Sequence, residues 1–168
     1  MILFKQATWI IWGGHIMSEL ERKEIIVRKV ETFDIDGIVP LCSQLGYPCT
    51  SDEVVPRMTK LMNDKEHIVF VAVNLDGKII GWVHSYINKL FYADNAAEIG
   101  GIVVDVLYRG NGVGKKLMKA VEEWAKRSEC MAVSLRSNSK RIEAHSFYNA
   151  IGYEKVKEQY TFRKYFEA

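Results

Sequence analysis

Three glycines and three cations stand together in segment 109–116, which reads Arg-Gly-Asn-Gly-Val-Gly-Lys-Lys. Glycine allows a positive φ and lets a ligand approach the backbone without a Cβ in between. Free N–H groups at the start of a helix bind anions. These residue types in this order therefore predict a loop that holds phosphate groups.

The elements on either side of this segment fit that interpretation. Residues 99–104 are rich in Ile and Val, which is typical of a buried strand. After the glycines, apolar residues recur at helical spacing, namely Val113, Leu117, Ala120, Val121 and Trp124. The loop is therefore expected at a strand-to-helix turn.

The charges of the expected helix are reversed from the usual pattern. A helix N-terminus normally attracts acids, yet Arg109, Lys115 and Lys116 crowd the first turn and the first acid is Glu122. Each such cation costs about 0.3–1 kcal/mol if nothing compensates it. A bound phosphate would compensate, whereas the alternative is a solvated basic turn whose glycines serve only chain reversal.

Two familiar phosphate loops do not fit the sequence. A Walker loop needs Gly in place of Arg109 and Ser or Thr in place of Lys116. The dinucleotide fingerprint needs a third Gly in place of Lys115. What remains, Arg-x-x-Gly-x-Gly, resembles the acetyl-CoA pyrophosphate loop of the GNAT superfamily of N-acetyltransferases.

A second block strengthens this resemblance. Residues 144–153, Ala-His-Ser-Phe-Tyr-Asn-Ala-Ile-Gly-Tyr, are similar to the family signature Ala-x-x-Phe/Leu-Tyr-x-x-x-Gly-Phe/Tyr. The alternative is an ordinary helix that ends at Gly152 and leads into a strand. The resemblance runs in order from about Ile25 to Phe166.

The resemblance and the sequence pattern imply an α/β (α+β) fold. The GNAT fold has a mixed, mostly antiparallel central sheet with helices on both faces, and its splayed central strands form the acetyl-CoA cleft. Asp34 and Ser51 are the expected helix caps, and Val55 and Met58 are expected on a buried helix face. Strands are expected at 24–30, 68–74, 78–88, 96–106, 131–136, 153–156 and 160–165, and helices at 34–45, 51–62, 112–127 and 140–150.

Length and composition indicate one domain. The chain has 168 residues, of which 48% are apolar, enough for one sizeable core. We expect an N-terminal extension at 1–23, in which Met17 is a candidate start, and a single N-acetyltransferase domain at 24–168. The apolar patch 7–12 is too short to span a membrane. If ordered it must cover apolar surface, for which a homodimer partner is a candidate.

The charge, the cysteines and the histidines argue against several functional classes of protein. A net charge of +2 with interspersed acids and bases argues against a nucleic-acid surface. The cysteines form no C-x-x-C pair, which favours a reduced, cytoplasmic setting, and the histidines form no metal-binding cluster. These residues are Cys42, Cys49, Cys130, His15, His67, His84 and His145.

The resemblance implies where the cosubstrate acetyl-CoA binds. Backbone groups of the splayed strand pair with the pantetheine arm, and the glycine loop holds the pyrophosphate. Many members carry an Asn where this chain has Arg141; either Asn138 replaces it, or Arg141 approaches a CoA phosphate or forms a surface ion pair. The implied set is Val103, Val104, Asp105, Arg109, Gly110, Asn111, Gly112, Val113, Gly114, Lys115, Asn138 and Arg141.

The chemistry of amine acetylation requires proton transfer. With a pKa of about 10.4, only about one lysine-like amine in a few thousand is neutral at pH 7. Glu98 occupies the position of a catalytic glutamate in some family members and is our candidate base; a solvated carboxylate, with water as the base, is the alternative. Tyr148 matches the tyrosine that often protonates the departing thiolate, and a core aromatic is its alternative.

The acceptor is a primary amine that the sequence does not identify further. In this family acceptors contact the first helices, their loop and the central strands, so Tyr47, Trp82, His84 and Tyr86 are candidates to line the site. The last three alternate and share one sheet face. A catalytically silent CoA-binding or regulatory module is the alternative function, against which Tyr148 argues.

Overall fold

The computed structural model describes residues 10–12, 15–17 and 24–166. The chain divides into two compact units, one ending at Leu135 and the other beginning at Arg136. The expected single domain over 24–168 stays a prediction. None of the described helices has the length and apolarity needed to cross a bilayer.

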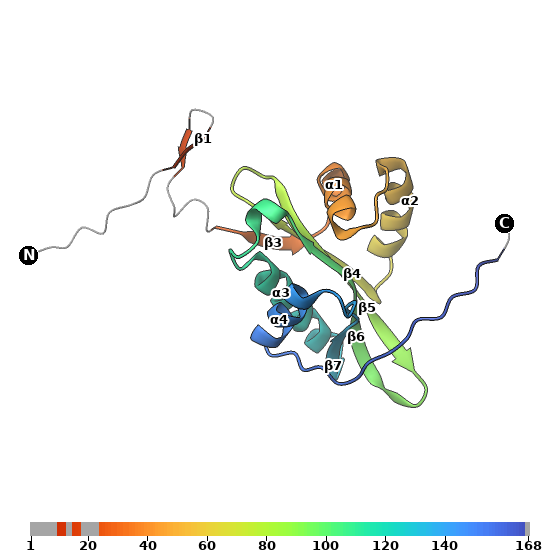
Figure 1. The fold of residues 1–168 in the computed structure, drawn as a ribbon. Coiled ribbons are helices and arrows are strands. Elements are labelled where there is room, and N and C mark those ends of the chain that lie inside the picture. Colours follow the sequence, from red (N-terminus) through yellow and green to blue (C-terminus); the bar gives the residue numbers. More distant parts are fainter. Residues whose placement is uncertain (1–9, 13–14, 18–23, 167–168) are drawn as a thin grey trace, which may run out of the picture. The chain divides into compact units, whose positions relative to one another are not determined.

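The first unit is built on a five-stranded sheet in the order β3-β4-β5-β6-β7 (Figure 1). The first three pairings are antiparallel, and β6 and β7 run parallel. This confirms the predicted mixed, mostly antiparallel sheet. The strands are β3 (Ile26–Lys29), β4 (His67–Val73), β5 (Ile79–Leu90), β6 (Ala93–Val104) and β7 (Ala132–Leu135).

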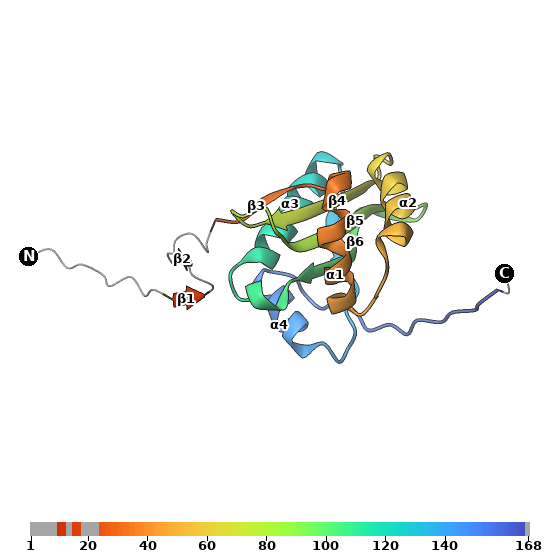
Figure 2. The ribbon, with the colours of Figure 1, turned by 90° about the horizontal axis from the view of Figure 1, so that it is seen from above.

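Helices cover both faces of this sheet, as predicted (Figures 1 and 2). α1 (Ile35–Leu45) and α2 (Ser51–Met62) lie on one face, and α3 (Val113–Arg127) lies on the other. The core under α1 and α2 includes Ile38, Leu41, Met58, Val69, Val71 and Val103. The buried face of α3 comprises Val113, Leu117, Met118, Val121, Trp124 and Ala125, most of which the helical spacing predicted.

The start of α1 is fixed by an ion pair. The Asp34 carboxylate, only 3% exposed, accepts both terminal N–H groups of Arg28 at 2.6 and 2.7 Å and the backbone N–H of Glu31 at 2.8 Å. Burial alone would raise the pKa of Asp34, but the hydrogen bonds from Arg28 and Glu31 and the Arg28 charge hold it below its usual value. Asp34 is the N-cap residue as predicted, but its side chain makes no cap hydrogen bond to α1; it closes the short helix η2 (Thr32–Asp34) instead.

Two details of α2 differ from the sequence prediction. Thr50 is its N-cap and accepts the Glu53 N–H at 3.3 Å, whereas the predicted cap, Ser51, donates to Asp36 at 2.9 Å. Val54 is buried and the predicted core residue Val55 is 41% exposed. The buried face of α2 is therefore rotated relative to the predicted one, because a single face of this helix packs on both β4 and α1.

Near the N-terminus, β1 (Ile10–Trp12) and β2 (His15–Met17) pair antiparallel in a separate two-stranded sheet. The rest of the predicted extension lies outside the described residues. The covering role expected for its apolar side chains therefore stays a prediction.

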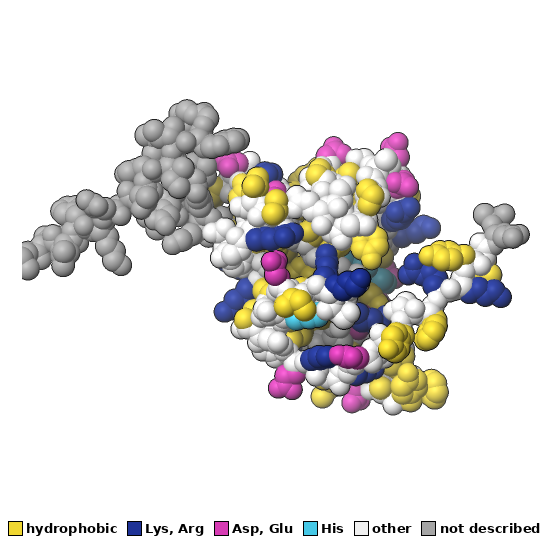
Figure 3. Space-filling view, in the orientation of Figure 1, with side chains coloured by type: hydrophobic (Ala, Val, Ile, Leu, Met, Phe, Trp, Pro, Cys, Tyr) yellow, Lys and Arg dark blue, Asp and Glu magenta, His cyan; other side chains and the backbone are white. Residues whose placement is uncertain are grey.

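The second unit contains α4 (Ile142–Ala150), which ends before Gly152 with a φ of +93°. The strands predicted at 153–156 and 160–165 are not formed in the described residues. Two isolated strands are marginal in water, and this unit offers them no further strand. Apolar and basic side chains lie together along this segment (Figure 3), and Val156, Tyr160, Phe162 and Phe166 are 84–92% exposed.

Candidate active site

The candidate donor site begins where β6 and β7 separate. Their pairing ends at Ile99 and Leu135, although β6 continues to Val104. Beyond Ile99, this edge of β6 has no strand partner among the described residues. The predicted splayed edge is therefore present in the first unit.

The pairing with β5 decides which backbone groups face this free edge. Asp105 donates its N–H to the Ile80 carbonyl oxygen at 2.9 Å, and its own carbonyl accepts the Tyr108 N–H at 2.8 Å. The prediction that Asp105 offers free groups is therefore wrong. In an antiparallel pair, successive residues point their backbone groups alternately toward and away from the partner. Val103 thus faces β5, whereas Val104 and Ile102, which the sequence argument missed, face the open edge.

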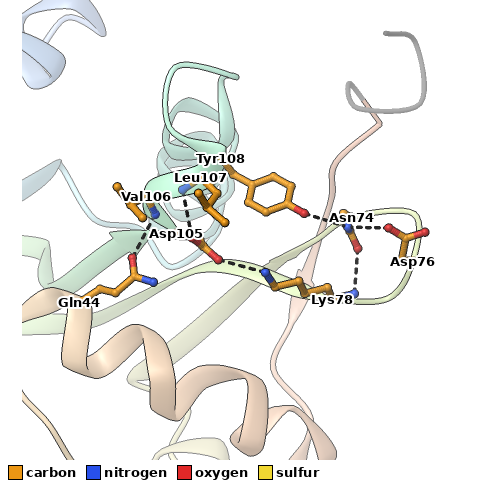
Figure 4. A network of polar contacts seen from close by, with 8 residues as sticks. All are labelled: Gln44, Asn74, Asp76, Lys78, Asp105, Val106, Leu107 and Tyr108. Atoms are coloured by element: carbon orange, nitrogen blue, oxygen red, sulfur yellow. Dashed lines mark hydrogen bonds and ion pairs between the residues drawn. The ribbon is translucent and has the colours of Figure 1, made fainter. Parts of the chain in front are cut away.

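The Asp105 side chain holds the turn that follows β6. It accepts the Leu107 N–H at 3.1 Å, inside the short helix η3 (Val106–Tyr108), and the Lys78 ammonium at 3.3 Å (Figure 4). Gln44 of α1 accepts the Val106 N–H at 3.0 Å. Burial alone would raise the pKa of Asp105, but the Leu107 N–H and Lys78 hold it below its usual value.

Lys78 and Tyr108 extend this network to the β4–β5 turn. The Lys78 ammonium lies 5.3 Å from the centre of the Tyr108 ring, and Asn74 contacts the Tyr108 hydroxyl at 3.4 Å (Figure 4). The network therefore joins α1, the turn and η3 directly before the glycine loop. Sequence reasoning missed these residues because they lie far apart along the chain and form no local pattern.

The glycine loop has the backbone geometry that the sequence predicted. Gly110 and Gly112 have φ values of +77° and +78°, which residues with a Cβ rarely adopt. Gly112 is the N-cap of α3, and no side chain caps that end. The Lys116 N–H bonds to the Gly112 carbonyl at 3.0 Å, so the N–H groups before it face the loop. Asn111 steadies the loop by donating to the Tyr108 and Arg109 carbonyls.

The three cations of the loop have different surroundings. The Lys116 ammonium donates to the Ile25 carbonyl at 2.9 Å and so ties α3 to the start of β3. Arg109 donates through Nε to the Val104 carbonyl at 3.2 Å, next to the splayed edge. Lys115 is exposed. Arg109 and Lys115 are therefore the better placed cations for a phosphate, and Lys116 has a structural partner.

The candidate acceptor residues of β5 lie on the sheet face that α1 and α2 cover. Trp82 pairs with Val103, and Tyr86 pairs with Glu98; directly paired residues share a face. Glu98 is only 6% exposed, so the structure places a buried carboxylate beside the predicted aromatic residues. Tyr47, on the loop between α1 and α2, is 74% exposed.

Two glycines of β6 make room for these rings. The β5–β6 register shifts between His84 and Ser85, which leaves Gly100 as the extra residue of a β-bulge. A Cβ at Gly100 would lie 2.9 Å from His84 Nδ1, and one at Gly101 would lie 3.2 Å from the Trp82 ring. A Gly-Gly pair inside a strand signals such an approach, but the sequence argument did not use it.

Trp82 also carries an unsatisfied donor. Its Nε1 is buried and is the one such side-chain atom without a hydrogen-bond partner in the part of the chain that the structure describes. A buried donor without a partner costs about 1–3 kcal/mol.

The remaining predicted residues belong to the second unit. The Tyr148 ring lies 5.2 Å from that of Phe147 and 6.2 Å from that of Tyr153. Burial raises the pKa of Tyr148, and the Arg141 charge opposes that shift. Asn138 accepts the Lys140 N–H at 2.9 Å, and Arg141 is the N-cap residue of α4. The roles of Asn138, Arg141 and Tyr148 toward acetyl-CoA stay predictions.

No group of three or more metal-binding side chains occurs among the described residues. The described polar groups of the first unit instead form two sets. The donor set comprises the loop 109–115 and the edge of β6, and the acceptor set comprises Glu98 and the β5 aromatic residues. Together they suit an acyl transfer that needs a phosphate-bearing donor and a base.

Comparisons with known proteins agree with this interpretation. The model of the acetyltransferase (GNAT) family matches residues 40–153, across the boundary between the two units. The chain is similar to aminoglycoside N(6′)-acetyltransferase type 1 of Stenotrophomonas maltophilia, with 27% identity over 128 residues, 71% of this chain and 81% of that protein. It is also similar to N-acetylaspartate synthetase of Xenopus tropicalis, with 34% identity over 87 residues, 52% of this chain and 31% of that protein.

A solved structure shows the same fold. Aminoglycoside N-acetyltransferase AAC(6′)-Iy in complex with CoA superposes with a TM-score of 0.76 at 21% identity, over 84% of this chain and 95% of that one. The family model itself spans more than half of the chain. This protein therefore belongs to the acetyltransferase (GNAT) family and is an acetyl-CoA-dependent N-acetyltransferase that acts on an amine.

Proposed function

We propose that the acceptor is a cationic, amine-rich small molecule, of which aminoglycosides are one class, bound on the face of β5 and β6 that α1 and α2 cover. The observation that carries this proposal is the buried carboxylate of Glu98 beside Tyr86 on that face. A carboxylate there attracts an ammonium group. The similarity to an aminoglycoside acetyltransferase supports the same class.

The reaction we propose is direct attack of the amine on the thioester in a ternary complex. The N–H groups of residues 113–115, with Arg109 and Lys115, bind the pyrophosphate, and the Val104 N–H and the backbone groups of Ile102 pair with the pantetheine arm. Glu98 acts as a base that takes a proton from the acceptor nitrogen. Tyr148 protonates the departing thiolate, and its raised pKa keeps the phenol protonated at neutral pH.

The test measures thiol release from acetyl-CoA with a panel of amines: an aminoglycoside that carries a 6′-amine, a linear polyamine, a lysine peptide and L-aspartate. We expect the first two to react best. Preferential reaction of L-aspartate, which the similarity to N-acetylaspartate synthetase makes the natural competitor, would contradict the proposed acceptor class.

A variant tests the proposed base. Glu98→Gln should lower kcat by about 10²-fold at neutral pH, the usual contribution of a general base, and should change the pH–rate profile. Glu123→Gln is the matched control, because Glu123 is an exposed carboxylate on α3 that pairs with Lys119. An unaltered profile in Glu98→Gln would remove Glu98 from the mechanism.

Two finer proposals concern the setting of the enzyme. The thiols of Cys42, Cys49 and Cys130 are unpaired, which supports a reducing, cytoplasmic location. The exposed apolar side chains of segment 153–166 support a homodimer that covers them. The mass of the protein measured in solution tests the homodimer.

A further inference from the structure

Two histidines form a hydrogen-bonded pair on the acceptor face. His67 Nδ1 lies 3.0 Å from His84 Nε2, and their ring centroids are 5.3 Å apart and nearly parallel. Such a contact needs a hydrogen on one of the two nitrogens. The pair therefore links β4 to β5 through a single shared hydrogen.

The two ends of this pair face different surroundings. His84 Nδ1 lies 2.9 Å from the position that a Cβ of Gly100 would take, at the exposed bulge of β6. At the other end, His67 Nε2 lies 3.9 Å from the Asp64 carboxylate, and His67 is one of the residues that line an open cavity of about 390 Å³ at the ends of β3, β4 and α2. The pair thus connects the acceptor face with a second, solvent-open region.

The chemistry of acetylation leaves one proton to be removed. An ammonium acceptor loses two protons when it becomes an amide, and the departing thiolate takes up one. One proton per turnover must therefore reach solvent. Glu98 is buried, so a path from the acceptor face to water is needed.

We propose that His84 and His67 form this path, with His84 taking the first proton from the acceptor ammonium and His67 releasing a proton to water in the cavity. This inference rests on the proposed acceptor position. His84 is the catalytic member because it contacts the acceptor nitrogen, and His67 acts through it.

The step balances in atoms and charge. The acceptor N–H bond breaks as His84 Nδ1 gains the proton, and in the same concerted step His84 Nε2 gives its hydrogen to His67 Nδ1 and His67 Nε2 gives its hydrogen to water, so that neither ring has to hold an extra proton. The neutral amine keeps its electron pair for attack on the thioester carbon, and Glu98 then takes the proton lost on attack. That proton balances the one that the departing thiolate takes up, so Glu98 ends the turnover ionised again. Exchange with solvent returns both rings to their starting tautomers.

The surroundings of the pair keep His84 neutral, which is the protonation state that the relay requires. Burial lowers the pKa of His84 to about 4, with a smaller contribution from the His67 charge, so that His84 is neutral near pH 7. The titratable and charged groups around the pair are Tyr86 of β5, Glu98 of β6, Asp64, Glu66 with its partner Lys89, and the cavity residues Lys29 of β3 and Lys65. Asp64 offers the negative charge at the exit.

The test is the pH dependence of kcat in His67→Gln, with the best amine of the panel. Gln can keep a hydrogen bond to His84 but cannot pass a proton on. We expect kcat to fall at least tenfold at pH 7 and to approach the unmodified enzyme near pH 10, where the amine arrives neutral. Added imidazole should restore part of the loss, and the KM for acetyl-CoA should stay unchanged.

The control is Glu66→Gln, which removes an exposed charge next to His67 that pairs with Lys89. It should leave the profile unchanged. A constant loss across pH without rescue by imidazole would show that His67 is only structural, and unchanged kcat values would also overturn the relay. If His67→Gln fails to fold, ¹⁵N NMR of the histidine rings in the unmodified enzyme decides: protonation of both rings above pH 6 excludes the relay.

These outcomes are separable from those for the proposed function. Absence of transfer to any amine by the unmodified enzyme would contradict the proposed acceptor class while leaving the NMR measurement informative. Transfer to an amine with an unaffected His67→Gln variant would reject the relay alone.

Discussion

At the scale of single residues, the buried acids divide into those that stabilise the fold and one that is proposed to act on the substrate. Asp34 and Asp105 are both buried acids whose pKa values are lowered by cationic and backbone donors. Glu98 is buried to a similar degree but lies among the acceptor aromatic residues. Burial alone therefore does not distinguish a structural carboxylate from one with a proposed catalytic role.

Asp34→Asn should destabilise the protein by about 3 kcal/mol, because it leaves the Arg28 charge without its buried partner. The lowered pKa of Asp34 means that its contribution is present above the unfolded pKa of about 4 and is lost as pH falls through the lower folded pKa. The stability difference between the variant and the unmodified enzyme should therefore shrink in acid.

Urea unfolding between pH 3 and 7 checks this prediction. Glu123→Gln removes a surface pair with Lys119 of 3.9 Å and should cost only about 0.5 kcal/mol. Equal effects of the two substitutions would contradict the buried role of Asp34.

Tyr148→Phe should lower kcat by about 10²-fold, because it removes the acid that protonates the thiolate. The affinity for CoA, measured by calorimetry, should change little. An unchanged kcat would refute the acid role and leave Tyr148 as a packed aromatic residue.

At the scale of elements, the glycine loop requires glycine because of its backbone angles, and not because neighbouring atoms would collide with a side chain. A Cβ at Gly112 would meet nothing within 4 Å, yet φ is +78°. Gly112→Ala should therefore cost about 1–2 kcal/mol of stability through the backbone alone and should also weaken CoA binding, because the start of α3 shifts.

Gly77→Ala is the matched control for that prediction. Gly77 has a φ of +79° and equally open surroundings, but it lies in the β4–β5 turn. Its substitution should lower the melting temperature by a similar amount without changing the Kd for CoA. Similar losses of CoA affinity in both variants would contradict a specific role for the loop.

The sequence predicted the elements of the first unit well because their signals are local. The loop 109–116, the hairpin at Gly77 and the face of α3 each follow from neighbouring residues. The Gln44, Lys78 and Asp105 network and the His67–His84 pair join distant residues, so no spacing rule finds them. The direction of the β6 backbone groups follows from register, which the sequence did not fix.

In the C-terminal segment, by contrast, a local sequence pattern predicted strands that the described residues do not form. Segments 153–156 and 160–165 contain aromatic and β-branched residues that favour strands, and the sequence alone predicted a strand pair there. A strand exists only with a partner for its backbone groups, and the pattern does not say which chain supplies it. Local pattern was therefore insufficient there.

At the scale of the whole molecule, the prediction concerns assembly. If segment 153–166 is covered by a second copy, light scattering should give twice the monomer mass. Replacing Tyr160 and Phe162, which are 91% and 92% exposed, by Ser should then yield a monomer that still binds CoA. Deletion of residues 1–16 should leave mass and folding unchanged if the N-terminal patch plays no part.

A monomeric mass for the unmodified enzyme at micromolar concentration would contradict the homodimer. A dimer that survives the Tyr160 and Phe162 substitutions but is lost in the deletion would assign the interface to the N-terminal patch instead.

The two glycines at the bulge of β6 bear on how such an enzyme diverges. The proposed donor half of the site depends on backbone angles, which tolerate few residue types, whereas the proposed acceptor half depends on the space that Gly100 and Gly101 leave for His84 and Trp82. A single substitution at either glycine would change the shape of the proposed acceptor site and leave the donor loop unchanged. Substitutions at positions 100 and 101 can therefore change which acceptor is bound while the binding of the acetyl donor is kept.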